Sequence, residues 1–586
     1  MIYPKIPLAQ TIVELFRQKD IANIVISPGS RNAPLTLGFC NNDFFKCYSI
    51  VDERCAAFFA LGIAQQIQKP VALVCTSGSA LLNYYPAISE AFYSNIPLIV
   101  LSADRPKHLL GIGDGQTIAQ KNVYGNHVHY STDLKVDLRD ENRLSEREEL
   151  PMIKNIENRL ERLFGIQQGI QKSNETEINT AIGLTLLKHG PVHINVPFDE
   201  PLYDTVQKPS VNPSFKALGY RAPKVEDAEI NDCVDQWYAA KKKMVLVGAM
   251  APDQIDPKYL NELANDNSVV VFTETTSNIQ HPNFFISIDK MIAPMSNGDF
   301  RKLQPDILLT FGGMIVSKKI KRFLREFQPK HHWHVDDLNS LDTFFCLSKY
   351  FQLTPNRFLS EFLPKTTHTA KSSYLPTWID VKRSRHKKHL EYLKHIAFSD
   401  FKAFSLILKT LPSNSMLQLG NSSTIRYAQL FRLNETIEVY CNRGTSGIDG
   451  STSTAIGAAV ANSKQTVFIT GDLSFFYDSN ALWNDYIPED FRIVLINNGG
   501  GGIFRILPGA EDTENFERFF ETKHDLDASM LCDMFKFEYL SAGNEIELET
   551  SLRHFYKTSK KPKLLEVFTP RKVNDRILLD YFEFIS

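Results

Sequence analysis

Residues 466–502 read TVFITGDLSFFYDSNALWNDYIPEDFRIVLINNGGGG and are the most informative stretch of the chain. Two apolar runs rich in β-branched residues, Thr466–Thr470 and Arg492–Asn497, predict buried strands. Between them the pattern predicts a helix, such as Ser479–Asp485. Strand, helix and strand in this order indicate a βαβ unit, and therefore a parallel sheet covered by helices.

Two polar side chains, Asp472 and Asn498, stand at the ends of these strands, 26 residues apart. Open α/β sheets bind ligands at the carboxyl ends of their strands. A carboxylate, an amide oxygen and a backbone carbonyl suit Mg²⁺, which completes its octahedron with phosphate oxygens and water. The glycines at 499–502 would let backbone N–H and carbonyl groups approach a diphosphate. Either half alone is typical of an ordinary turn; the pairing predicts a metal–diphosphate site.

The same alternation of apolar strands and helices continues through most of the chain. It predicts an α/β protein of three domains, each a mostly parallel sheet flanked by helices, with borders at 1–205, 206–370 and 371–586. The helices predicted in the first third are Glu53–Gln68 and Ala80–Tyr93. The other predicted strands are Ile21–Ser27, Cys47–Asp52, Val71–Thr76, Leu98–Ala103, Met244–Gly248, Val269–Thr273, Ile307–Phe311, His334–Asp336, Met416–Leu419, Glu438–Cys441 and Lys563–Phe568.

Composition excludes several classes of function. The chain has 586 residues and a net charge of −2, so no global field attracts nucleic acid or an anionic membrane. Its eight cysteines never form C-x-x-C, which indicates free thiols in a reducing compartment. No run of 18 apolar residues predicts a membrane span, and no signal peptide is evident. We therefore expect a cytoplasmic protein with neither a nucleic-acid nor a membrane partner.

The Gly471-Asp472 … Asn497-Asn498 arrangement resembles the metal–diphosphate motif of thiamine diphosphate enzymes, although Leu473 stands where that family usually has a third glycine. The resemblance implies thiamine diphosphate and Mg²⁺, for which Mn²⁺ can substitute. It makes Asp472, the Asn498 side chain and the Gly500 carbonyl the metal ligands. It also implies a carboxylate from the first domain that hydrogen-bonds N1′ of the cofactor, and Glu53 is the candidate. The alternative for Glu53 is that it merely caps its helix.

Seven further short sequence motifs point to one family among these enzymes. They are Ile26–Leu35 (ISPGSRNAPL), Thr76–Ala80 (TSGSA), Ser102–Pro106 (SADRP), Pro191–Pro197 (PVHINVP), Gly420–Ser422 (GNS), Asn442–Gly450 (NRGTSGIDG) and Ile503–Pro508 (IFRILP). Together they resemble the menaquinone-pathway family of these enzymes. That resemblance implies decarboxylation of 2-oxoglutarate and 1,4-addition of the resulting succinic semialdehyde carbanion to isochorismate.

Both of these substrates carry carboxylates, which a planar Arg fork binds bidentately. The resemblance assigns catalytic roles to Ser30, Arg31, Glu53, Gln116 and Arg443. It assigns substrate contacts to Arg31, Arg105, Gln116, Lys318, Lys319, Ser422, Arg426, Arg443, Ile503, Phe504 and Leu507. It assigns cofactor contacts to Glu53, Ser77, Gly78, Asn421, Ser422, Ile448, Gly471, Asp472, Leu473, Asn498, Gly500, Gly501 and Ile503. Taken singly, such arginines are more often solvated charges, and such apolar residues are equally typical of a core.

Two alternatives stay open. Another thiamine diphosphate-dependent 2-oxoacid decarboxylase or carboligase would prefer small neutral side chains at Arg105, Lys319, Arg426 and Arg443. A catalytically silent cofactor-binding protein would lack one of the key polar residues, all of which are present. Because the N1′ carboxylate and the diphosphate site lie on different domains, we expect a homo-oligomer, dimer or tetramer, with the site completed across a subunit interface as in the family.

Overall fold

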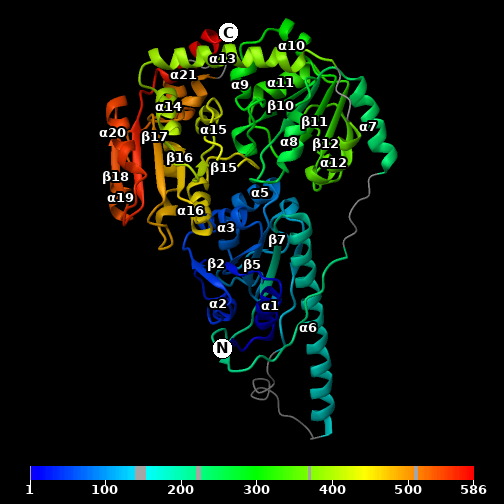
Figure 1. The fold of residues 1–586 in the computed structure, drawn as a ribbon. Coiled ribbons are helices and arrows are strands. Elements are labelled where there is room, and N and C mark those ends of the chain that lie inside the picture. Colours follow the sequence, from blue (N-terminus) through cyan, green and yellow to red (C-terminus); the bar gives the residue numbers. More distant parts are fainter. Residues whose placement is uncertain (1, 139–153, 220–225, 367–370, 507–512) are drawn as a thin grey trace. The chain divides into compact units, whose positions relative to one another are not determined.

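The computed structural model describes residues 2–138, 154–219, 226–366, 371–506 and 513–586, with the side chains of 154–164 left aside. The chain forms two compact units. Unit 1 consists of Met1–Tyr220, Thr452–Ser463 and Asp478–Pro488, and unit 2 of Arg221–Ser451, Lys464–Tyr477 and Glu489–Ser586. Figure 1 shows the elements of both units coloured along the sequence.

Unit 1 is built on a six-stranded sheet in the order β3-β2-β4-β5-β7-β6, in which every pair is parallel. The central strands are buried along their whole length because helices cover both faces. Its strands are β2 (Asn23–Ile26), β3 (Lys46–Ser49), β4 (Val71–Cys75), β5 (Leu98–Asp104), β6 (Ser131–Asp133) and β7 (Val192–Pro197), and β1 (Tyr3–Pro4) pairs antiparallel with β8 (Thr205–Val206). Its helices are α1 (Pro7–Gln18), α2 (Ala33–Cys40), α3 (Glu53–Ile67), α4 (Ala80–Asn83), α5 (Tyr85–Ser94) and α6 (Lys154–Lys188).

One helix of unit 1 comes from the last third of the chain. Helix α16 (Ser451–Ala461) packs on α3 so closely that a Cβ added at Gly62 would lie 2.1 Å from the Thr454 carbonyl oxygen. A Cβ at Gly457 would lie 2.0 Å from the carbonyl oxygen of Phe59. The glycines are therefore needed for backbone-to-backbone contact between the two helices.

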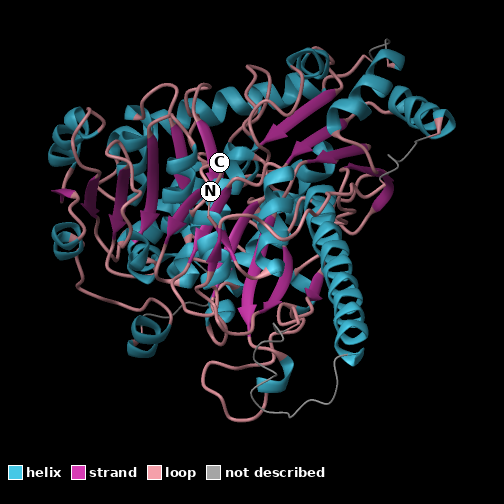
Figure 2. Ribbon diagram, turned by 90° about the horizontal axis from the view of Figure 1, so that it is seen from below, coloured by secondary structure: helices cyan, strands magenta, loops and turns pink. Residues whose placement is uncertain are grey.

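Unit 2 contains two further parallel sheets. The first has the order β10-β9-β11-β12-β13 and the second β15-β14-β16-β17-β19-β18. The first comprises β9 (Lys243–Val247), β10 (Val269–Thr273), β11 (Ile307–Phe311), β12 (His331–Val335) and β13 (Leu347–Phe351), with helices α7 (Asp227–Ala239), α8 (Pro257–Ala264), α9 (Ile288–Ile292), α10 (Asn297–Leu303), α11 (Lys318–Glu326), α12 (Pro355–Phe362) and α13 (Tyr374–His395). The second comprises β14 (Met416–Leu419), β15 (Glu438–Cys441), β16 (Thr466–Gly471), β17 (Arg492–Asn497), β18 (Glu538–Ala542) and β19 (Lys563–Phe568), with helices α14 (Asp400–Thr410), α15 (Ser423–Ala428), α17 (Asp472–Tyr477), α18 (Glu514–Phe519), α19 (Ser529–Met534), α20 (Glu545–Phe555) and α21 (Asn574–Phe584). Figure 2 shows helices against the strands of these sheets.

Strand order locates the places where a ligand can bind. In the last sheet the chain moves outward from β14 to β15 and then returns to β16, so the topological switch lies between β14 and β16. In the first sheet the corresponding switch lies between β2 and β4. In the middle sheet it lies between β9 and β11, where a Cβ on Gly248 would meet the Gly313 carbonyl oxygen at 1.9 Å. The two loops at the middle switch are therefore in direct contact with each other.

The prediction of three parallel α/β sheets flanked by helices is confirmed. The domain borders at residues 205/206 and 370/371 stay a prediction. Sequence analysis did not predict the edge strands β13 and β18, because their partly exposed residues lack a continuous apolar run. Among the described residues, no helix is long and apolar enough to cross a membrane.

Two predicted helices were wrong in detail. The segment Ala80–Tyr93 is divided into α4 and α5, because Pro86 lacks an N–H and favours the first turn of a new helix. The α-helix that follows β16 is α17, which begins at Asp472, and Ser479–Leu482 forms only a 3₁₀ turn. Asp472 therefore stands at the start of a helix directly after the strand.

Candidate active site

The carboxylate of Asp472 lies at the switch point of the last sheet and is buried, with 3% of its surface exposed. Its Oδ1 accepts a hydrogen bond from the Leu473 N–H at 2.6 Å, and its Oδ2 accepts one from the Gly500 N–H at 3.0 Å. The end of β16 and the loop after β17 are thus joined through this side chain. Sequence analysis predicted this juxtaposition of Asp472 with the glycine run.

The backbone of the glycine run after β17 is held by hydrogen bonds within the protein. Its four N–H groups, predicted to face a diphosphate, all donate within the protein: to Asn497 Oδ1 (Gly499), Asp472 Oδ2 (Gly500), the Glu521 carbonyl (Gly501) and the Gly500 carbonyl (Gly502). Gly500 has φ +146°, and a Cβ there would lie 2.6 Å from the Glu521 carbonyl oxygen. Glycine is required here for backbone conformation and close packing, and the approach of this backbone to a diphosphate stays a prediction.

Asn498 contacts a residue that sequence analysis missed. Its Nδ2 donates to Oδ2 of Asp400 at 2.9 Å, and the Thr569 hydroxyl donates to the other carboxylate oxygen at 2.5 Å. Asp400 is 3% exposed, and burial raises its pKa to about 6. It begins α14, 98 residues before Asn498, and no local motif marks it.

Sequence analysis also missed Glu521 and His524, which contact the loop after β17. The buried Glu521 carboxylate accepts from Arg505 at 2.5 and 2.6 Å and from Arg571 at 2.6 Å, which anchors the segment that supports Gly501. His524 Nε2 lies 3.4 Å from Asp472 Oδ2, and this carboxylate raises the pKa of the imidazole. Both residues follow the 507–512 segment and belong to no recognised block.

Asp400, Asp472, Asn498 and Gly500 line a cavity of about 140 Å³. Most of the predicted cofactor and metal contacts of the last sheet line it. The lining residues are Asp400, Phe404, Asn421, Ser422, Ser423, Thr424, Ile448, Gly471, Asp472, Leu473, Ser474, Ile496, Asn498, Gly500, Gly501, Gly502, Ile503 and Phe504. The structure thus brings together the strand-end loops of β14, β16 and β17.

The donor set fits a divalent cation and a diphosphate. Asp472 supplies a buried carboxylate and Asn498 an amide oxygen, and among the described residues no group of three or more His, Cys, Asp or Glu side chains forms a protein-only metal cage. Such a site suits Mg²⁺, which is usually held by one or two carboxylates together with water and substrate phosphates. Ser422 stands at the start of α15 with φ +67°.

Arg443 is positioned by Asn421, one of the residues predicted to contact the cofactor. The Asn421 side chain donates to the carbonyls of Asn442 and Gly447, both at 2.7 Å, and accepts from Arg443 Nη1 at 2.7 Å. The amide therefore fixes both the loop and the guanidinium of Arg443, whose buried Nε has no hydrogen-bond partner among the described residues.

The predicted lysines stand at the start of α11, which two acidic residues anchor. Glu274 is buried and accepts from the N–H groups of Val316 and Ser317, both at 2.7 Å, while the Ser317 hydroxyl donates to Asp289. Burial raises the pKa of Glu274 to about 7.

The predicted basic residues occupy different environments at this end of unit 2. Lys318 is exposed, and Lys319 Nζ lies 4.6 Å from the centre of the Phe582 ring. Burial lowers the pKa of Arg426, and the charge of Asp289 acts in the opposite direction. Sequence analysis missed Lys321, whose pKa burial lowers. It also lies close enough to Glu274 and Arg443 for their charges to affect that pKa.

The apolar candidates are partly solvent-accessible. Ile448 is 38% exposed, and its carbonyl accepts from the Ser474 hydroxyl at 2.6 Å. Ile503 and Phe504 line the cavity described above, and Phe504 is 36% exposed. Neither Ile448 nor Phe504 is therefore an ordinary core residue, which was the alternative. Leu507 lies outside the described residues.

Glu53 belongs to unit 1, where it is the first residue of α3. The helix is capped by its neighbour, since Asp52 Oδ1 accepts from the Cys55 N–H at 3.2 Å. Asn83 Nδ2 donates to Glu53 Oε2 at 3.3 Å, and the carboxylate remains partly exposed. Because Asp52 performs the capping, the Glu53 carboxylate is left available for another role.

A second cluster of unit 1 gathers around Arg105. Its Nη1 donates to the Ser77 hydroxyl and to the Gln116 carbonyl, both at 2.8 Å. Gly78 has φ +93°, and a Cβ there would lie 3.1 Å from the Cα of Gln116. Gln116 itself has φ +56° and is exposed. The structure thus places four predicted site residues from three loops next to one another.

Arg31 is almost fully buried, at 8% exposure. Its Nη1 donates to the Phe198 carbonyl at 3.1 Å, and its Nη2 lies 3.4 Å from Glu200 Oε1. Burial and the neighbouring charge of Arg105 both lower its pKa, so the two guanidinium groups are close. Ser30, the residue before it, is exposed.

A buried amide network that sequence analysis missed supports this cluster. Gln120 accepts from the Gly78 N–H at 2.9 Å through Oε1 and donates to Asn195 Oδ1 at 2.7 Å. Asn195 Nδ2 in turn donates to Asp104 Oδ2 at 2.8 Å, directly before Arg105. Asn195 lies in the PVHINVP block, but nothing in the sequence indicated its partner.

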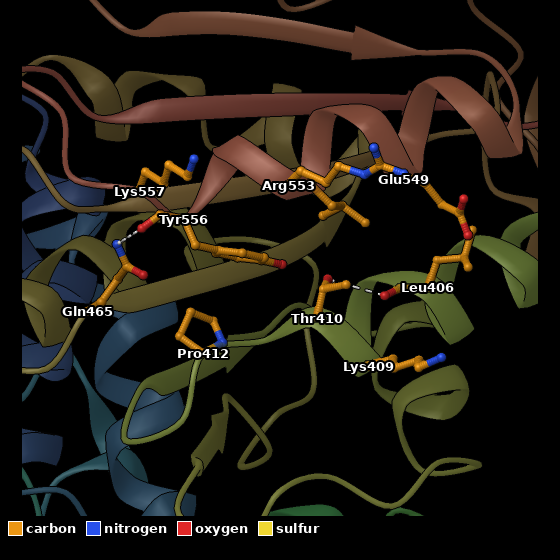
Figure 3. Close-up of a pocket in the computed structure, with 10 residues that line it drawn as sticks. Leu406, Lys409, Thr410, Pro412, Gln465, Glu549, Arg553, Tyr556 and Lys557 are labelled. Atoms are coloured by element: carbon orange, nitrogen blue, oxygen red, sulfur yellow. Dashed lines mark hydrogen bonds between the residues drawn. The ribbon is translucent and has the colours of Figure 1, made fainter.

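A larger cavity lies elsewhere in unit 2. Figure 3 shows it between residues of α14 and α20, with the ring of Tyr556 extending into it. Its volume is about 680 Å³, and its lining includes the exposed Lys409, Arg553 and Lys557 but none of the predicted site residues.

Comparison with known proteins agrees with this geometry. Family models match residues 6–127 (thiamine pyrophosphate enzyme, N-terminal TPP binding domain), 218–419 (middle domain of thiamine pyrophosphate) and 420–567 (C-terminal TPP binding domain). A protein of Flavobacterium psychrophilum named 2-succinyl-5-enolpyruvyl-6-hydroxy-3-cyclohexene-1-carboxylate synthase is 54% identical over 583 residues, which cover 100% of both chains. Synthases of the same name are 53% identical in Christiangramia forsetii, over 100% of both chains, and 37% identical in Phocaeicola vulgatus, over 97% of both. The chain is therefore a thiamine diphosphate-dependent enzyme and belongs to the 2-succinyl-5-enolpyruvyl-6-hydroxy-3-cyclohexene-1-carboxylate synthase family.

Proposed function

We propose that this enzyme decarboxylates 2-oxoglutarate and joins the remaining four-carbon unit to isochorismate by 1,4-addition, a step of menaquinone biosynthesis. The products would be CO₂ and 2-succinyl-5-enolpyruvyl-6-hydroxy-3-cyclohexene-1-carboxylate. The observation that carries this proposal is the full-length similarity to synthases named for that product, at 54% identity. The basic residues at both switch points support it, because both substrates are anionic.

When bound, thiamine diphosphate supplies the nucleophilic carbon and the electron sink. We assign to Glu53 the hydrogen bond to N1′ of the aminopyrimidine, where its carboxyl group would share a proton with the ring nitrogen. Its partly exposed place at the start of α3 supports this assignment, because Asp52 already caps the helix. Ser77, Gly78, Asn421, Ser422 and Ile448 are assigned to the walls of the cofactor site.

We assign the Mg²⁺ site to Asp472, the amide oxygen of Asn498 and the carbonyl of Gly500. The cation would neutralise a diphosphate placed beside Gly471, Leu473, Gly501 and Ile503, and Mn²⁺ would serve in its place. The place of Asp472 and Asn498 in the wall of one cavity supports this, since Mg²⁺ prefers oxygen ligands such as carboxylates and amide carbonyls.

Substrate carboxylates are assigned to the cations of both units: Arg31 and Arg105 in unit 1, and Lys318, Lys319, Arg426 and Arg443 in unit 2. Ser30 and Gln116 would orient the reacting groups. Ile503, Phe504 and Leu507 would exclude water from the reacting carbon, which limits its protonation in place of carbon–carbon bond formation.

We further propose that the enzyme works as a homo-oligomer, with each site completed across a subunit interface. Glu53 belongs to unit 1, whereas Asp472 and Asn498 belong to unit 2. The cytoplasmic location expected from composition stays a prediction.

Product analysis tests the reaction directly. The enzyme is incubated with 2-oxoglutarate, isochorismate, thiamine diphosphate and Mg²⁺, and products are followed by mass spectrometry together with CO₂ release. Equal consumption of both substrates is expected, and removal of Mg²⁺ by a chelator should stop it. Release of CO₂ without consumption of isochorismate would overturn the assignment.

The alternative is another thiamine diphosphate-dependent 2-oxoacid decarboxylase or carboligase. Pyruvate in place of 2-oxoglutarate distinguishes the two, because pyruvate lacks the second carboxylate that the arginines would bind. Turnover of pyruvate at the higher kcat/KM would favour the alternative.

A further inference from the structure

The amide of Asn498 presents either its oxygen or its nitrogen to a metal ion, depending on rotation about the last side-chain bond. Only the oxygen binds a cation, because the NH₂ group has no lone pair to offer. The residue that fixes this rotation therefore controls the metal site without contacting the metal.

Asp400 is in the position to do this. It lies at the start of α14, is 3% exposed, and accepts from Asn498 Nδ2 at 2.9 Å. An ionised carboxylate only accepts hydrogen bonds, so the amide nitrogen must face it. The Asn498 oxygen consequently points away from Asp400, on the side of the amide that the cavity with Asp472 can use.

The carboxylate is itself held in place. Thr569, which follows β19, donates its hydroxyl hydrogen to the second carboxylate oxygen at 2.5 Å. The Asp400 N–H donates to Asn574 Oδ1 at 2.8 Å, and Asn574 Nδ2 donates to the Pro570 carbonyl at 2.9 Å. With both oxygens occupied by donors, Asp400 orients Asn498 and is not itself offered as a metal ligand.

Charge is consistent with this role. Asp400 and Asp472 are both buried and line the same cavity, and no ion pair to Asp400 is formed among the described residues. Two buried carboxylates repel each other, and a divalent cation beside Asp472 relieves that repulsion.

We propose that Asp400 is a positioning residue of the metal site, which holds the Asn498 amide so that its oxygen faces the cation. This inference rests on the assignment of Mg²⁺ to Asp472 and Asn498 under the proposed function. Removing a group that orients a metal ligand typically weakens metal binding by roughly 10- to 100-fold.

The test measures metal affinity rather than turnover. Mg²⁺ is titrated into the full-length protein with saturating thiamine diphosphate by calorimetry, and Mn²⁺ is titrated in parallel by electron paramagnetic resonance. Asp400→Leu should raise the Kd of both ions by about 10- to 100-fold. Asp400→Asn should have a smaller effect, because it retains one acceptor oxygen but no longer selects the rotation of Asn498.

Two further variants separate positioning from general structural damage. In the exchange variant D400N/N498D, the residue 400 amide donates to the new carboxylate at 498 and accepts from Thr569, so Mg²⁺ affinity should return to within a few-fold of wild type. Thr569→Val is the matched control: it removes a hydrogen bond to Asp400 but leaves the Asn498 contact, and its Kd should stay close to that of wild type. A purely structural role would lower thermal midpoints without this rescue.

The outcomes are distinguishable from failure of the proposed function. If Asp472→Ala abolishes Mg²⁺ binding while folded Asp400→Leu binds like wild type, the positioning role is wrong and the metal site stands. If Asp472→Ala also binds Mg²⁺ normally, the metal site itself is wrong. Should Asp400→Leu fail to fold, failure of the exchange variant to improve on Asp400→Asn would overturn the positioning role.

Discussion

Individual side chains of the candidate site depend on neighbours that hold them in one orientation. Asp52 caps α3 and leaves Glu53 available, and Asn421 directs Arg443. Arg105 is held between the Ser77 hydroxyl and the Gln116 carbonyl. Each of these hydrogen bonds fixes the orientation of a side chain of the candidate site. The site is therefore preorganised before its ligands bind.

Replacing Glu53 by glutamine should separate binding from proton transfer. Glutamine has nearly the same shape but cannot share a proton with N1′, so exchange of the C2 hydrogen of bound cofactor should slow by at least about 100-fold. Cofactor affinity should change little. Exchange is measured by NMR after quenching in D₂O.

Asn83→Ala serves as the control for Glu53, because it removes only the hydrogen bond at 3.3 Å. Its exchange rate should remain near that of wild type. Unchanged exchange in Glu53→Gln would mean that Glu53 belongs only to the helix start.

Replacing Arg105 by lysine should reduce kcat/KM for the substrate whose carboxylate it binds. Lysine keeps the charge but loses the planar fork and the simultaneous contacts with Ser77 and Gln116. Loss of a charge-assisted hydrogen bond costs roughly 1.5–3 kcal/mol, or about 10- to 150-fold. The exposed Lys107, changed to Gln, is the control. Equal kcat/KM for R105K and wild type would exclude a substrate contact.

At the scale of elements, α3 packs on α16 with direct contact between their backbones. Besides the two glycines, the buried Asp478 accepts from the Ser453 N–H at 2.8 Å and from its hydroxyl at 3.0 Å. The Cys55 thiol of α3 contacts the same carboxylate. The charge of Arg54 lowers the pKa of Asp478 and so partly offsets the effect of burial. Burial nonetheless raises the pKa of Asp478 to about 6.

This raised pKa predicts a pH dependence of stability. The pKa of an aspartate in the unfolded chain is about 3.9. Between about pH 4 and pH 6 the folded state therefore binds more protons at this group than the unfolded state does. The stability contributed by this group therefore falls as pH rises through that window and stays low above it. Asp478→Asn does not ionise, so its stability relative to wild type should increase from pH 4 to pH 7, by at most about 3 kcal/mol.

Scanning calorimetry of the two proteins at several pH values checks this, with unfolding midpoints as the readout because a chain of two units need not unfold in two states. Other titrating groups, such as Asp400, are present in both proteins and cancel in the difference. Midpoint curves that run parallel across pH 4 to 7 would contradict the prediction.

At the scale of the whole molecule, the residues proposed for the two halves of the chemistry belong to different units. Glu53 lies in unit 1, whereas Asp472 and Asn498 lie in unit 2. If the site is completed across a subunit interface, two inactive variants can complement each other. A mixed dimer of Glu53→Gln and Asp472→Asn chains holds one intact site and one that carries both changes.

Coexpression or refolding of the two variants together should therefore restore activity. Random assembly of equal amounts of the two chains makes half of the dimers mixed. In each mixed dimer one of the two sites is intact, so roughly a quarter of wild-type activity is expected. Each variant alone should remain inactive. Mixed dimers that form, as seen by native mass spectrometry, but show no activity would place the whole site within one chain.

The sequence by itself determined the α/β class, the parallel sheets and the positions of Asp472, Asn498, Arg105 and Arg443 at strand ends. These features are local, since a buried strand between helices needs a continuous apolar run and a site residue needs a fixed place after that run. The family blocks added residue roles because they are contiguous in sequence.

Only the tertiary structure decided which partners hold those residues. Asp400 meets Asn498 across 98 residues, Gln120 meets Asn195 across 75, and Glu521 meets Arg571 across 50. Tertiary structure also showed which groups of the protein accept from the N–H groups of the glycine run. A hydrogen bond between distant segments leaves no periodicity or spacing in either one, so the orientation of the site becomes visible only once the sheets have brought their loops together.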